Sequence, residues 1–85
     1  MNNNTFLKIL EHTGEHAVIN CKYIVDVHHG FTPSSDPTKQ KGCVVIEMVN
    51  NSVYYTFGNL FEIGNEIERI LGQYEQVKIF GANNE

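Results

Sequence analysis

Residues 42–58 read GCVVIEMVNNSVYYTFG, two apolar arms on either side of Asn50-Asn51. Alternating apolar residues predict strands, and Asn tolerates the positive φ that a tight hairpin turn requires. A two-residue loop at Asn50-Asn51 places one set of side chains on a shared core face, namely Val44, Ile46, Met48, Val53, Tyr55 and Phe57. The opposite, outer face then carries Cys43, Val45, Glu47, Val49, Ser52, Tyr54 and Thr56. The stretch therefore predicts a β-hairpin with one buried face.

A further hairpin is predicted upstream, where the apolar runs 6–10 and 17–19 flank Thr13-Gly14. Pairing through this turn puts Leu7, Ile9 and Val18 on one face and Phe6, Leu10, Ala17, Ile19 and Cys21 on the other. Both faces are partly apolar, so either is a candidate for the core. Residues 23–28 are rich in β-branched side chains and predict either a second portion of the preceding strand or a strand of their own.

A helix is predicted from Asn59, whose side chain can accept from the first free amides, to about Leu71. Its apolar stripe, spaced at 100° per residue, consists of Leu60, Ile63, Ile67, Ile70, Leu71 and Tyr74. Gly64 lies near this stripe and predicts a close approach of helix to strand, and Gly72 is the expected end of the helix. Residues 74–80 alternate again and predict a final strand, added to this sheet or to the sheet of a neighbouring subunit.

These elements predict an α+β fold: a small antiparallel β-sheet of four to five strands, with one helix in the C-terminal half packed on one face. The 85 residues have room for one domain, residues 1–85, with one thin core. Residues 1–4 and 82–85 are expected to be flexible tails. Residues 29–41, rich in Gly, Pro and Ser, are expected to form a mobile loop.

Composition restricts the function classes. The formal charge of −4 opposes attraction to phosphate, which makes nucleic acid an unfavoured partner. The longest aliphatic run, residues 44–46, is far shorter than the roughly 20 residues of a spanning helix, and the polar start of the chain lacks the positive charge of a secretion signal. A cytoplasmic protein without membrane contact is predicted, and Cys21 and Cys43 are expected to be free thiols.

The residues with potential chemistry form no convergent set in the sequence. No nucleophile, base or acid combination indicates an enzyme, and no catalytic, cofactor-binding or small-molecule site is predicted. Four histidines, at positions 12, 16, 28 and 29, raise the question of metal binding, but no close-spaced ligand pair of the zinc-finger type is present. Histidines at the surface ends of strands explain them, and His28 and His29 should point to opposite faces. No metal site is assigned.

The series Leu7-Lys8-Ile9, Gly14, Ile19-Asn20, Ile24 and Val27, followed by the 44–57 hairpin and the isoleucines at 63, 67 and 70, resembles the small bacterial FlbD-type family associated with flagella and swarming. The resemblance covers roughly residues 6–71 and implies a bacterial protein built of hairpins and a short helix. Phe57-Gly58-Asn59 stands where the family usually has a basic-acidic pair, and residues 30–42 look like an insertion.

The function predicted from these observations is a non-catalytic interaction or regulatory module that self-associates, with a homodimer as the expected assembly. The residues assigned to the interaction are Val45, Val49, Tyr54, Phe61, Val77 and Ile79. One alternative is a nucleic-acid-binding sheet that uses Tyr54, Lys22, Lys39 and Lys41. A second alternative is a zinc-binding module that uses His12, His16, His28 and Cys21.

Overall fold

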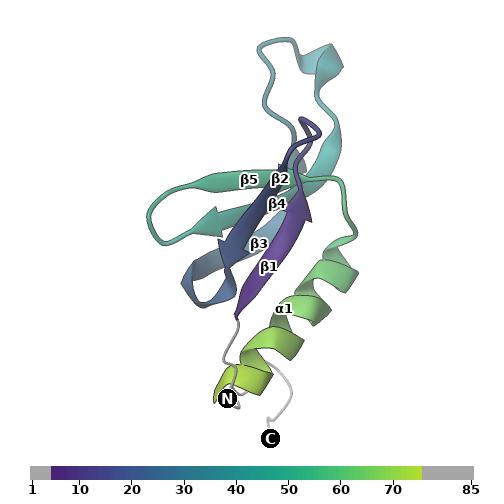
Figure 1. The fold of residues 1–85 in the computed structure, drawn as a ribbon. Helices are drawn as coiled ribbons and strands as arrows, with labels where there is room; N and C mark the ends of the chain where they lie inside the picture. Colours follow the sequence, from purple (N-terminus) through teal and green to yellow (C-terminus); the bar gives the residue numbers. More distant parts are fainter. Residues whose placement is uncertain (1–4, 76–85) are drawn as a thin grey trace, which may run out of the picture.

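A computed structural model describes the backbone of residues 5–75 and the side chains of residues 5–72 (Figure 1). Its elements are β1 (Phe6–Leu10), β2 (His16–Asn20), the 3-10 turn η1 (Cys21–Tyr23), β3 (Ile24–Phe31), the 3-10 turn η2 (Pro37–Lys39), β4 (Gly42–Met48), β5 (Val53–Thr56) and α1 (Leu60–Glu75). The predicted α+β class is confirmed. The strands form two antiparallel sheets, β1-β2 and β3-β4-β5, so each sheet has fewer strands than the single sheet of four to five that was expected.

The core lies between the two sheets. Ile9 and Ile19 from the β1–β2 hairpin pack against Val44 and Ile46 of β4, and all four side chains are buried. The sheets are also joined at one corner, where the Thr56 hydroxyl donates to the Leu10 carbonyl at 2.7 Å. Each sheet covers the apolar face of the other, so the two together bury side chains that a single hairpin would leave exposed.

Helix α1 packs against β3 and the turn η1. It begins as predicted, with the Asn59 side chain accepting from the Glu62 amide at 3.0 Å. Ile67 and Ile70 are buried against Cys21, which confirms this part of the apolar stripe, whereas the side chain of Tyr74 lies outside the described residues. The helix continues to Glu75, so the predicted end at Gly72 is wrong. The predicted close approach at Gly64 is also wrong: a Cβ there would meet nothing within 4 Å, since the residue faces a groove of about 390 Å³ between α1 and β3.

The register of the later hairpin differs from the prediction by one residue. Ile46 pairs with Tyr54, not with Tyr55, because the loop has three residues, 49–51. Only Asn51 in this loop has a positive φ, 75°, as expected for a type I turn followed by a left-handed residue. Side chains alternate between the faces of a strand, so the slip moves the whole of β5 to the other face. Tyr54 and Thr56 therefore point toward the core, and Phe57 is 53 % exposed.

The first hairpin has the same loop. Gly14, with a φ of 95°, is the third residue of loop 12–14, and Ile9 pairs with Ala17. The two predicted sets of faces are therefore corrected. Leu7 and Ile9 share the core face with Ala17 and Ile19, whereas the outer face exposes Phe6, Leu10 and Val18.

The predicted loop 29–41 begins too early, because β3 continues to Phe31. Beyond β3, the Thr32 amide donates to the Lys41 carbonyl at 2.9 Å and the Lys41 amide donates to the Thr32 hydroxyl at 3.0 Å. Asp36 caps the turn η2 by accepting from the Thr38 amide at 3.0 Å. The segment therefore has local structure, and its mobility stays a prediction. The tails 1–4 and 82–85 and the predicted strand at 77–80 lie outside the described residues.

Candidate functional site

The residues assigned to an interaction surface are distributed differently from the expectation. Val45 is only 6 % exposed, and Tyr54 faces the core because of the changed register of β5. Val49 and Phe61 are 63 % and 75 % exposed. Val77 and Ile79 lie outside the described residues. The outer face of the hairpin was predicted to expose both Val45 and Tyr54. Val45 is instead buried, and Tyr54 points to the other face.

A groove brings two of the assigned residues together. Val49 and Tyr54 both line an open hollow of about 420 Å³ between β2 and the tip of the β4–β5 hairpin. Its other lining residues are Phe6, Val18, Ile19, Asn20, Tyr23, Met48 and Asn50. Most of this lining is apolar. In the described part of the chain, β2 pairs only with β1, so the backbone of one lip of the groove belongs to an edge strand.

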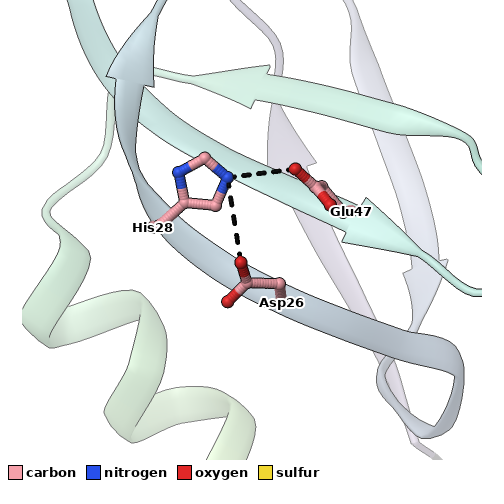
Figure 2. Close-up of side chains that lie close together, drawn as sticks. All are labelled: Asp26, His28 and Glu47. Carbon is pink, nitrogen blue, oxygen red and sulfur yellow. Dashed lines mark hydrogen bonds and ion pairs between the residues drawn. The ribbon is translucent and has the colours of Figure 1, made fainter.

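A polar cluster of Asp26, His28 and Glu47 lies on the face of the three-stranded sheet that points away from the β1–β2 hairpin (Figure 2). Asp26 and His28 are two residues apart on β3, so their side chains point to the same side. Glu47 is directly opposite Asp26 on β4. One ligand atom from each of the three side chains lies within 4.8 Å of the other two.

His28 is held between oxygen atoms. Its Nε2 is 3.1 Å from Glu47 Oε2 and 3.9 Å from Asp26 Oδ2, and its Nδ1 is 2.9 Å from the carbonyl oxygen of His29. The His29 carbonyl, then the Glu47 and Asp26 carboxylates, raise the pKa of His28 above its ordinary value. The cluster can hold a proton on the imidazole or accept another cation.

The zinc set suggested by the sequence is not assembled. Among the described residues, the cluster of Asp26, His28 and Glu47 is the only group of three or more side chains placed for metal binding. The ring of His12 packs edge-on against Tyr55 with centroids 5.7 Å apart. Cys21 is 1 % exposed under α1.

The two cysteines are free and buried, which confirms the prediction of free thiols. Burial, and then the nearby Glu66 carboxylate, raise the pKa of Cys21 to about 11, and burial raises the pKa of Cys43. Because the thiolate is the nucleophile, neither side chain is prepared for attack on a substrate. The stacking surface of the nucleic-acid alternative is weakened as well, since Tyr54 faces the core.

Asp26 and Glu47 were not among the site residues predicted from the sequence. Asp26-x-His28 on a predicted strand is a signal that two polar side chains share a face. The position of Glu47 beside them depends on the register between β3 and β4, which a connection as long as residues 32–41 does not determine.

Comparison with protein families, curated proteins and solved structures gives no match. The resemblance to the FlbD-type family therefore stays a prediction. Within residues 5–75, α1 lacks the length and apolar character needed to cross a bilayer.

Proposed function

We propose that this protein is a non-catalytic interaction or regulatory module that self-associates through the groove between β2 and the β4–β5 tip. The supporting observation is the groove itself, which combines an apolar lining with an edge of β2 that pairs with no other strand within residues 5–75. The resemblance to small FlbD-type proteins favours a regulatory role in a bacterium. The buried free thiols suit a reducing cytoplasm, which is the proposed location.

The rim of the groove is unusually apolar for a surface in contact with water. Val18 is 62 % exposed, Val49 is 63 % exposed, and Phe6 and Tyr23 are 54 % and 52 % exposed. Aromatic and aliphatic side chains around one hollow are typical of a binding surface, because their burial by a partner is favourable. Tyr54 and Met48 provide a half-buried floor.

The proposed occupant is the segment 77–80 of a second copy. In an added strand, its sequence Val-Lys-Ile-Phe places Val77 and Ile79 on one face and Lys78 and Phe80 on the other. An extended segment satisfies the free backbone groups of an edge strand while its apolar side chains enter the neighbouring hollow. Association of this kind also enlarges a core that is small for one chain.

The test is the mass of the protein in solution, measured by sedimentation equilibrium across a concentration series. The full chain is expected to form a dimer, and Val49→Glu and Val18→Glu are each expected to weaken it at least tenfold by placing a charge in an apolar interface. A chain ending at residue 75 is expected to be monomeric. Val25→Glu is the matched control, since Val25 is also 63 % exposed but lies outside this groove.

Two outcomes contradict the proposal. One is a full chain that stays monomeric at high micromolar concentration. The other is a dimer that Val49→Glu and the shortened chain leave unchanged. Thermal unfolding of each variant, followed by circular dichroism, separates lost association from lost folding, because rim substitutions at exposed positions should leave the monomer folded.

A further inference from the structure

We propose that Asp26, His28 and Glu47 bind a divalent transition-metal cation on the outer face of the three-stranded sheet. This site is separate from the groove of the proposed interaction, and none of its three side chains lines that groove. It also differs from the zinc set of the sequence analysis, with which it shares only His28.

The backbone imposes an unfavourable charge pair. Asp26 and Glu47 are direct partners across β3 and β4, and two like charges in such a pair repel each other. The strands fix the positions of both Cβ atoms, so the carboxylates cannot separate widely without turning away from His28. The pair therefore favours a cation at the point where the two carboxylates converge.

The ring of His28 points its second nitrogen to the same place. The carbonyl of His29 can only accept, so Nδ1 carries a hydrogen and donates to it at 2.9 Å. A neutral ring then directs the lone pair of Nε2 toward the two carboxylates (Figure 2). Either a second proton or a metal ion occupies the space between them. Metal-binding histidines commonly donate their other N–H to a backbone carbonyl, which holds the ring in place.

The distances fit a metal after small side-chain adjustments. Ligand atoms around a tetrahedral ion with bonds of 2.0–2.1 Å lie about 3.4 Å apart. The two separations that involve Nε2 are 3.1 and 3.9 Å, on either side of that value. The side chains of Asp26, His28 and Glu47 are 58 %, 42 % and 45 % exposed, so an ion can enter directly and water can fill its remaining positions.

The donor set indicates the class of metal. One imidazole nitrogen with two carboxylate oxygens suits Zn²⁺, Co²⁺ or Mn²⁺, whereas Mg²⁺ and Ca²⁺ prefer oxygen ligands alone. Three protein ligands leave an open coordination position, as in sites where water or a group from another molecule completes the shell.

The test is isothermal titration calorimetry with Zn²⁺ on the full, tag-free chain after removal of metal with EDTA. We expect one Zn²⁺ per chain, and at least tenfold weaker binding in His28→Gln and in Glu47→Gln. Asp26→Asn is a third variant with the same expected loss, because it removes a ligand at an exposed position. Mn²⁺ added to ¹⁵N-labelled protein should broaden the amide signals of residues 26–28 and 47 before others.

The controls exclude adventitious binding by other side chains. His16→Gln removes a histidine in the first hairpin, outside the cluster, and should leave the affinity unchanged. The proposal is overturned if Zn²⁺ does not bind at concentrations up to about 1 mM, the weak end of metal sites in proteins. It is also overturned if His28→Gln binds as well as the parent, or if Mg²⁺ binds as tightly as Zn²⁺. If Zn²⁺ does not bind, the cluster is an ion pair between protonated His28 and the two carboxylates and nothing more.

Discussion

Gly14 and Asn51 occupy the same position in the two hairpin loops of this chain. Each is the third residue of a three-residue loop, and each has a positive φ, 95° at Gly14 and 75° at Asn51. The loops close with the same two hydrogen bonds: Glu11 and Met48 each donate to a carbonyl four residues on, and each accepts from the loop's third residue. Both hairpins therefore obtain their register from one left-handed residue.

Replacing either residue by alanine should destabilise the protein. A Cβ disfavours the left-handed region, so Gly14→Ala and Asn51→Ala are each expected to lower the free energy of unfolding by about 1–2 kcal/mol. Urea denaturation measures the difference. Gly42→Ala serves as a control, because that glycine has no positive φ and a Cβ there meets nothing within 4 Å. Equal effects at positions 14 and 42 would show that the left-handed conformation is not the cause.

Gly64→Ala should have the opposite effect. Gly64 lies inside α1 and faces open space, so alanine gains helix propensity without a clash. The expected gain in the free energy of unfolding is about 1 kcal/mol, measured in the same way. A loss instead of a gain would mean that another group occupies the groove beside this residue.

Gly30→Ala should destabilise by steric conflict. A Cβ at this position on β3 would lie 2.6 Å from Cγ2 of Val45, which is buried on the neighbouring strand β4. Overpacking of this kind costs about 1–3 kcal/mol. The double variant with Val45→Ala removes the conflicting methyl groups, so a double-mutant cycle should show strong coupling between the two positions. Additive effects would contradict the contact.

Cys21 should be slow to react in the folded protein. Its pKa of about 11 lies two units above the ordinary value of 9.0, so the thiolate at neutral pH is about 100-fold rarer than in an unfolded chain. Burial under α1 slows the reaction further. Alkylation by iodoacetamide, followed by mass spectrometry of peptides, should modify Cys21 at a rate set by local opening of the helix. Rapid modification under native conditions would contradict this placement.

The metal-free protein should lose the contribution of His28 to stability as the pH rises. The folded-state pKa of His28 is raised above its unfolded value, so its stabilisation is fully present below the unfolded pKa and disappears as the pH passes the folded pKa. In EDTA, His28→Gln should therefore lower the Tm more at about pH 6 than at about pH 8, on either side of the ordinary histidine range. When the same comparison is made in a protein that already carries Glu47→Gln, this pH dependence should be smaller, because one cause of the raised His28 pKa is removed. A Tm difference that does not vary with pH would contradict the ion pair.

Local sequence patterns were sufficient for the α+β class, the cap at Asn59, the stripe containing Ile67 and Ile70, and the burial of Val44 and Ile46. These features depend on neighbours within a few residues, where spacing alone places side chains on a common face. The side chains of β5 were predicted on the wrong face. Asn51 is compatible with a loop of two residues and with a loop of three, and a change from one to the other moves every side chain of β5 to the opposite face.

Contacts between distant segments account for the rest. The division into two sheets depends on Ile9 and Ile19 covering β4, a packing that neither hairpin specifies alone. The meeting of Asp26, His28 and Glu47 depends on the β3–β4 register across the long connection 32–41. Short-range periodicity carries no information about which residue of one strand lies opposite which residue of another, so this polar cluster follows from the packed structure and not from any local pattern.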